Sequence, residues 1–213
     1  MNKKLFNFLS PVILIVICFS FAIIFKDLLS IYVYIPCIMV LYWGLSLLFV
    51  HICIKISSIK SFFKKPSGNI LWLFIALILG FIPIMTLIDN IALINSPLTV
   101  VIIIVFALTN AFFEEMFWRG FVLNYIFSSK IISYIYSLIL FTISHFVWAI
   151  TSFAVRNIYT IIALIIFAAV WNIIRFKTKS IWWSIVSHFL VNFFSLSALA
   201  MVNIYIPSAG LLW

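Results

Sequence analysis

Acidic residues are almost absent from this chain, since only four of its 213 residues are Asp or Glu. Charged residues of either sign make up 8% of the sequence, whereas 67% of the residues are hydrophobic. Apolar runs of about 20 residues recur from end to end, and each is long enough to cross a hydrocarbon core roughly 30 Å thick. The sequence therefore predicts a polytopic membrane protein.

Other patterns are missing too. The alternating segments of roughly ten residues that form a membrane β-barrel are not present, so the spans are expected to be helices. The cysteines Cys18, Cys37 and Cys53 form no CxxC pair, and we expect free thiols without a disulfide or metal role. Residues 1–25 have no small-x-small cleavage site after the apolar stretch, so they are expected to remain as a membrane span instead of being removed as a signal peptide.

The fold class predicted is all-α, a polytopic transmembrane helical bundle. About seven spans are expected, at residues 5–25, 28–54, 69–89, 98–127, 131–150, 157–174 and 180–203. Ten of the 13 basic residues then fall on the side of the N-terminus, against Lys26 and Arg156 on the other side, while Arg119 lies within a span. Because cytoplasmic loops are enriched in Lys and Arg, this pattern predicts an N-in, C-out topology.

The net charge of +9 is accounted for by these basic loops, which would lie against the anionic headgroups of a lipid bilayer. No nucleic-acid partner is expected. The longest polar hinge, Lys55 to Asn69, is predicted to be a cytoplasmic loop with an interfacial helix around Phe62 and Phe63.

The sequence shows no internal repeat and no soluble domain, so residues 1–213 are predicted to form a single membrane domain. Nearly all the polar groups at membrane depth lie in its second part, which makes residues 98–203 the candidate catalytic core helices. We expect residues 1–68 to pack around that core.

Two of the four acidic residues are neighbours, in the motif Glu114-Glu115-x-x-x-Arg119. An ionisable side chain at membrane depth is costly, and it therefore points to function. On a helix, Glu115 and Arg119 are four residues apart and can pair, whereas Glu114 points about 100° away. One carboxylate would then be neutralised while the other stays free for proton transfer. The alternative is a buried ion pair that only locks helix packing.

Two further pairs have the same helical spacing, Phe141-x-x-x-His145 in the fifth span and His188-x-x-x-Asn192 in the seventh. The imidazole and the amide of the second pair share one face, so both can act on one bound group, as an oxyanion hole requires. We expect these side chains and the glutamates to face one water-accessible cavity between the fourth, fifth and seventh spans, which opens towards the cytoplasm. A histidine that only supports packing is the alternative.

With these three motifs in order on successive helices, the chain resembles the CPBP family, which comprises intramembrane CAAX proteases and bacteriocin-processing enzymes and is also called the Abi family. The resemblance covers about half of the chain. It implies an all-helical membrane endopeptidase whose catalytic residues match these positions of the sequence: Glu114, Glu115, Arg119, His145, His188 and Asn192.

In the mechanism that the resemblance implies, Glu114 with His145 activates a water, and Glu115 with Arg119 supports that site. His188 and Asn192 stabilise the oxyanion. The family is often labelled a metalloprotease, and two histidines with two glutamates could hold zinc (Zn²⁺). Since the sequence contains no His-Glu-x-x-His motif, we expect that no cofactor is required, with zinc as the alternative.

The expected partner is a membrane-associated peptide or protein substrate, and the expected location is a bacterial plasma membrane, in which the chain is an integral protein. A competing hypothesis is a non-enzymatic membrane protein, either a bacteriocin immunity scaffold or a small transporter component. A transporter would have Gly or Pro breaks in two related halves, and Gly44, Gly80, Pro36 and Pro83 show no such symmetry.

Overall fold

The structure, a computed structural model, describes residues 3–205, and all the regular structure in that range is helical. The long helices are α1 (Lys3–Phe25), α2 (Ile31–Cys53), α4 (Leu71–Phe81), α6 (Pro97–Glu114), α8 (Lys130–His145), α9 (Ile158–Thr178) and α10 (Trp182–Phe194). Shorter segments connect them: α3 (Ile56–Lys60), η1 (Ser61–Phe63), α5 (Ile84–Asp89), η2 (Ile91–Leu93), η3 (Glu115–Val122), α7 (Leu123–Tyr125), η4 (Trp148–Ile150), η5 (Ala154–Arg156) and α11 (Ser197–Met201).

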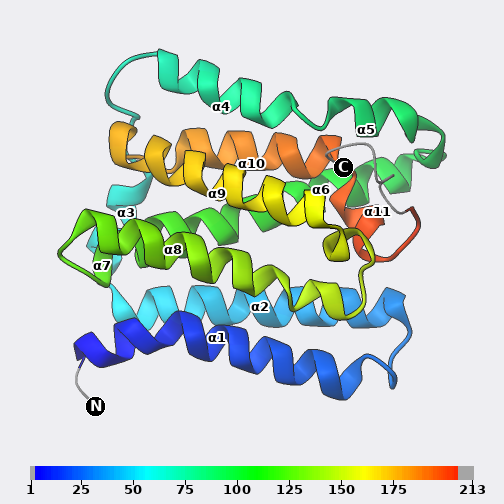
Figure 1. Cartoon of the computed structure of the whole chain (residues 1–213), viewed down its shortest axis with the longest axis horizontal. Coiled ribbons are helices and arrows are strands. Elements are labelled where there is room, and N and C mark those ends of the chain that lie inside the picture. The colour runs from blue at the N-terminus through cyan, green and yellow to red at the C-terminus, as the bar shows by residue number, and fades with distance from the viewer. Residues whose placement is uncertain (1–2, 206–213) are drawn as a thin grey trace.

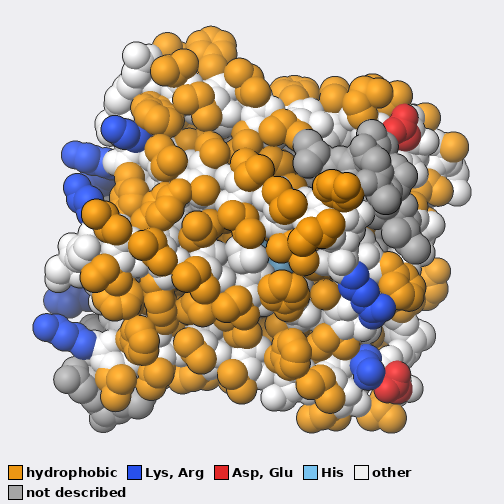
Figure 2. Space-filling view, in the orientation of Figure 1, with side chains coloured by type: hydrophobic (Ala, Val, Ile, Leu, Met, Phe, Trp, Pro, Cys, Tyr) orange, Lys and Arg blue, Asp and Glu red, His pale blue; other side chains and the backbone are white. Residues whose placement is uncertain are grey.

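The helices lie side by side with their axes roughly along one direction (Figure 1). Helices α1 and α2 form one edge of the bundle, α4 and α5 form the opposite edge, and α6, α8, α9 and α10 lie between them. Helix α10 packs against both α4 and α6, and α8 packs against α9. The side chains that face outward are mostly apolar, as Figure 2 shows for one face, which is the surface that lipid requires.

Within residues 3–205, six helical segments are long and apolar enough to cross a membrane: Lys4–Phe25, Ile31–Cys53, Leu71–Asp89, Pro97–Tyr125, Lys130–Ile150 and Ile158–Thr178. The predicted all-α transmembrane bundle is therefore confirmed. The seventh segment is shorter than expected. It consists of α10 and α11, which are separated at Leu196, a residue in the left-handed conformation with φ of 51°. Because an L-residue rarely adopts that conformation inside a helix, the α-helix ends there.

Side chains at the ends define where several helices begin and stop. The hydroxyl of Ser96 accepts a hydrogen bond from the amide of Thr99, and Pro97 occupies the first turn of α6. Helix α9 continues to Thr178, four residues beyond the end predicted from the sequence. Arg175 and Lys177 therefore lie in its last turn, where positive charge is favoured by the helix dipole.

The polar hinge packs against the end of the helical bundle. Phe62 is fully buried, and its backbone carbonyl accepts a hydrogen bond from the amide of Ile181. The amide and hydroxyl of Ser67 both donate to the carbonyl of Thr178 at 2.9 Å. A short helical segment, η1, is thus present around Phe62 as predicted, and the aromatic ring of Phe62 packs against Gly120 in η3.

Helix α2 is attached to the candidate core through aromatic side chains with polar tips. The indole of Trp118 donates to the hydroxyl of Tyr42 at 2.8 Å, and the indole of Trp43 donates to Oδ1 of Asn110 at 3.1 Å. In a membrane interior such groups need protein partners because water is absent. The N-terminal part of the chain therefore packs directly against the segments that carry the glutamates.

Candidate active site

The segment that carries the two glutamates changes its helical form between them. Helix α6 ends at Glu114, and the π-helix η3 begins at Glu115 and runs to Val122, with all eight of its residues buried. A π-helix is rare and is found mostly at functional sites, where it re-aims side chains. The wider turn means that the side-chain directions expected for an α-helix do not apply across this junction.

The pairing between Glu115 and Arg119 expected from the sequence is present. Nη1 of Arg119 lies 3.0 Å from Oε1 of Glu115, and neither side chain is exposed. The same Glu115 oxygen is 2.9 Å from Nδ1 of His188, whose Nε2 is 3.7 Å from Oε2 of Glu114. The two carboxylates therefore converge on one imidazole. This occurs where α6 ends and the π-helix η3 begins, and Glu115 pairs with Arg119 as the sequence predicts.

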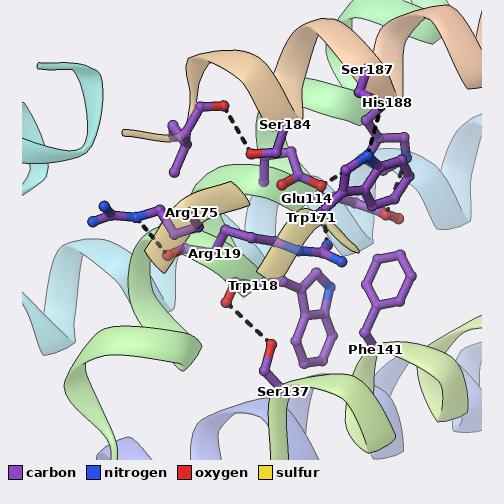
Figure 3. Close-up of polar contacts among 12 residues, drawn as sticks. Glu114, Trp118, Arg119, Ser137, Phe141, Trp171, Arg175, Ser184, Ser187 and His188 are labelled. Atoms are coloured by element: carbon purple, nitrogen blue, oxygen red, sulfur yellow. Dashed lines mark hydrogen bonds and ion pairs between the residues drawn. The ribbon is translucent and has the colours of Figure 1, made fainter. Parts of the chain in front are cut away.

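Arg119 is held mainly by aromatic rings. Its Cζ lies 4.2 Å from the centroid of Phe141 and 5.1 Å from that of Trp171, while Nε and Nη2 have no hydrogen-bond partner among residues 3–205. Cation–π attraction is strongest where water is excluded, and it gives the Phe141 position of the second motif a physical role. Trp171 also stacks on the ring of His188 at 4.2 Å, so the indole contacts both the guanidinium and the imidazole (Figure 3).

Hydrogen bonds define the tautomers of the two histidines. Nδ1 of His145 lies 2.8 Å from the carbonyl oxygen of Phe141, which can only accept, so this nitrogen carries the proton. Nδ1 of His188 donates in the same way to Glu115. In the neutral ring the Nε2 atom of each histidine is then a free acceptor. Among the described residues, the histidine next to Glu114 is His188, and His145 forms no ion pair with it.

Glu114, His145, His188 and Asn192 line one internal cavity of about 60 Å³, so the predicted convergence is confirmed for these four. Glu115 and Arg119 lie behind it and are completely buried. A polar cavity of this size has room for water. Within the part of the chain that the structure describes, Oε2 of Glu114 and Nδ2 of Asn192 are buried without a hydrogen-bond partner. The cavity thus contains an unpaired acceptor and an unpaired donor.

The direction of the cavity differs from the prediction. Its lining continues from Glu114 past Ser152 to Ala200, at the end of the bundle opposite to the basic loops. Towards the basic end, the fully buried rings of Phe117 and Phe121 fill the bundle. The cavity therefore extends away from the basic end, which is the end that the sequence predicts to be cytoplasmic, and aromatic side chains of η3 fill the bundle on that side.

Three residues near the site were not singled out in the sequence. The side chains of Tyr42 and Asn110 both interact with the carboxylate of Glu114, and Trp171 supports Arg119 and His188. Asn110 and Trp171 are detectable as polar or amphipathic groups in the middle of apolar spans. Tyr42 carries no such signal, because α2 contains several aromatic residues and only its packing against α6 and η3 brings it to the site.

The donors around the cavity do not fit a zinc ion. Nδ1 of His188 and Oε1 of Glu115 already bind each other, and the buried guanidinium of Arg119 places a positive charge beside them. Within residues 3–205, no group of three His, Cys, Asp or Glu side chains is arranged to hold a metal ion. Within the part of the chain that the structure describes, Cys18, Cys37 and Cys53 form no disulfide bond.

Comparison with known proteins agrees with this geometry. Residues 96–194 match the family model described as type II CAAX prenyl endopeptidase Rce1-like. No curated protein and no solved structure matches the chain significantly. The matched segment contains all three motifs, with the glutamates near its start and the His188–Asn192 pair at its end. The segment that contributes most of the cavity lining is therefore similar to the Rce1-like CAAX prenyl endopeptidases, which confirms the resemblance to the CPBP family.

Proposed function

We propose that this protein is an intramembrane endopeptidase that hydrolyses a peptide bond in a membrane-associated peptide or protein. One observation carries the proposal. A buried cavity of the membrane bundle contains the unpaired carboxylate oxygen of Glu114 and the unpaired amide donor of Asn192, together with two imidazoles. An acceptor for the proton of a water and a donor for an oxyanion are the two groups that peptide hydrolysis needs.

In this mechanism Glu114 is the general base. It takes a proton from a water in the cavity while the water oxygen forms a bond to the carbonyl carbon of the substrate. The distance of 3.7 Å between Oε2 of Glu114 and Nε2 of His188 is too long for a direct hydrogen bond, and a water beside the two atoms in the cavity can contact both. Glu114 then gives its proton to the leaving amine as the C–N bond breaks.

The amide of Asn192 stabilises the oxyanion that forms at the carbonyl oxygen. Its Oδ1 accepts a hydrogen bond from the hydroxyl of Ser197, whereas its Nδ2 has no hydrogen-bond partner among the described residues. Nδ2 is therefore the atom of Asn192 that is available to a new partner. The sequence assigns His188 to the same task. Because its Nδ1 proton is directed at Glu115, His188 is better placed to orient the water than to donate to the oxyanion. His145 lines the same cavity, where its unprotonated Nε2 is available as an acceptor for a further polar group.

No metal ion takes part in this mechanism. Arg119 and Glu115 act as positioning residues, since their ion pair and the rings of Phe141 and Trp171 hold His188 in place. The cavity wall beyond Glu114 is largely apolar, with Trp148, Leu164 and Phe167 among its members. That wall supports a substrate with a lipid-modified or membrane-embedded segment, in agreement with the prenyl endopeptidases named in the family description.

The test compares the wild-type protein with Glu114→Gln in detergent, using a library of peptides, some of them prenylated, and mass spectrometry to detect cleavage. Loss of cleavage in Glu114→Gln at an unchanged melting temperature is the expected result. The matched control is Asp89→Asn, the same chemical change at the end of α5 away from the cavity, and it should cleave like the wild type. Cleavage by Glu114→Gln at the wild-type rate would contradict the proposal. A wild type that cleaves no peptide would favour the non-enzymatic alternative.

A further inference from the structure

A second pocket lies at the basic end of the bundle, away from the candidate active site. It has a volume of about 270 Å³ and lies between the beginning of α8 and the end of α9. Three basic side chains, Lys130, Arg175 and Lys179, line it together with the polar side chains of Asn124 and Ser133. Since both helices span the membrane, a pocket at their ends lies at the level of the lipid headgroups.

The guanidinium of Arg175 has no negatively charged partner in this pocket among the described residues. The residue is only 8% exposed, and its Nε donates to the backbone carbonyl of Arg119 at 3.3 Å. Its two terminal nitrogens point away from that carbonyl, as Figure 3 shows, and have no hydrogen-bond partner among the described residues. Positive charge on a side chain that is mostly buried and has no counter-charge is costly, so an anion is expected beside these terminal nitrogens.

No acidic residue of the chain can supply that charge. Of the four acids, Glu114 and Glu115 are buried in the active site, and Asp27 and Asp89 lie at the end of the bundle opposite to the pocket. Figure 2 shows most of the Lys and Arg side chains at one end, while the acidic side chains in view lie at the other. The three positive charges around the pocket are therefore unbalanced within the protein.

The start of helix α8 adds a second attraction for an anion. The helix has 16 residues, and its first turn contributes Lys130 and Ser133 to the pocket wall. Ser129 caps only the amide of Ile132. The positive end of the helix dipole and the remaining free amides favour a negatively charged group at this place.

We propose that this pocket binds a phosphate group, supplied either by an anionic phospholipid headgroup or by free phosphate. The terminal nitrogens of Arg175 bind the phosphate oxygens, and Lys130 and Lys179 neutralise its charge. The bound group also holds Arg175 against the carbonyl of Arg119, the residue that pairs with Glu115 in the active site. Occupation of the pocket thus stabilises the segment η3, and the effect is measurable as a rise in melting temperature.

The experiment measures the melting temperature of the full chain in a neutral detergent by tryptophan fluorescence. Three probes are titrated: short-chain phosphatidylglycerol, short-chain phosphatidylcholine and inorganic phosphate. The test variants are Lys130→Gln and Lys179→Gln, both at exposed positions, so that folding is not at risk. The matched control is Lys177→Gln, which removes the same charge from the same end of α9 but does not line the pocket.

We expect phosphatidylglycerol to raise the melting temperature of the wild type, with phosphatidylcholine much weaker. Each test variant should lose about fivefold in apparent affinity, the effect of one basic residue near an anionic lipid surface. Lys177→Gln should stay within about twofold of the wild type, since a specific pocket does not depend on it. An equal response to inorganic phosphate would identify free phosphate as the source. Equal loss in all three variants, or no preference for phosphatidylglycerol over phosphatidylcholine, would overturn the proposal.

Discussion

At the residue scale, two neighbouring glutamates have different environments. Glu115 is engaged by Arg119 and by His188, at 3.0 and 2.9 Å. Glu114 keeps one carboxylate oxygen without a hydrogen bond, in a cavity with room for water. The difference supports the proposed division of labour, in which one carboxylate positions the site and the other handles a proton. Both carboxylates are equally deep in the bundle, so this division of labour depends on which of them faces the cavity.

Asn192→Ala should reduce turnover by roughly 10²–10³-fold with little change in KM, because one oxyanion donor contributes mainly in the transition state. Steady-state kinetics with a cleaved peptide in detergent provide kcat and KM. Asn172→Ala is the control, since it removes an equally buried amide of α9 that does not line the cavity. A variant with an unchanged kcat would show that Asn192 has no part in the reaction.

Chelation should leave the activity unchanged, because the proposed mechanism uses the side chains of Glu114 and Asn192 and no metal ion. The measurement is the rate of peptide cleavage before and after dialysis against a strong chelator, together with the metal content of the purified protein. A zinc enzyme would lose its metal and its activity together. Stoichiometric zinc that is lost with activity would contradict the metal-free mechanism and leave the endopeptidase proposal in place.

At the element scale, the π-helix η3 is the structure on which the site depends. It directs Glu115 and Arg119 towards His188, and its aromatic residues close the bundle on the basic side. The hinge segment η1 packs on its outer face, where the ring of Phe62 lies directly over Gly120. A Cβ atom on Gly120 would come 2.5 Å from that ring, so only glycine allows the two segments to approach this closely.

Gly120→Ala should therefore destabilise the protein by about 1–3 kcal/mol, the usual cost of overpacking a core, and should lower activity through displacement of η3. Gly44→Ala is a matched control, because no atom lies within 4 Å of the added Cβ atom and alanine is the better helix former. Thermal unfolding in detergent compares the two variants. Equal melting temperatures would show that the contact between Phe62 and Gly120 carries no constraint.

At the scale of the whole molecule, charge is distributed unevenly along the bundle axis. Figure 2 shows most Lys and Arg side chains at one end, and both acidic side chains in view at the other. This agrees with the sequence pattern that predicts an N-in, C-out topology, because basic residues are retained on the cytoplasmic side. If that orientation holds, the cavity extends from Glu114 towards the outer half of the membrane.

The topology is testable with single cysteines in a background that lacks the native ones. A membrane-impermeant maleimide applied to intact bacterial host cells should label Asp27→Cys, an exposed position between α1 and α2. It should label Ser57→Cys, an exposed position of α3, only after the membrane is permeabilised. The reverse pattern would place the basic end outside, against the charge rule.

The sequence alone determined the class of the protein and the order of the helices, and it singled out Glu114, His145, His188 and Asn192, which line one cavity. Composition and the length of the apolar runs are local properties, and a membrane admits only helices that satisfy their own backbone. The i, i+4 spacing likewise predicted the pair formed by Glu115 and Arg119, since both members lie on one segment. The three ordered motifs led to the family that residues 96–194 match.

The tertiary structure decided the features that depend on contacts between distant segments. The π-helical turn that brings both glutamates to His188, the break at Leu196 and the burial of Phe62 each follow from packing against other helices. The interaction of Tyr42 with Glu114 and the direction of the cavity have the same origin. Periodicity describes one helix at a time, so it identifies the side chains that share a face but not the partner that this face meets.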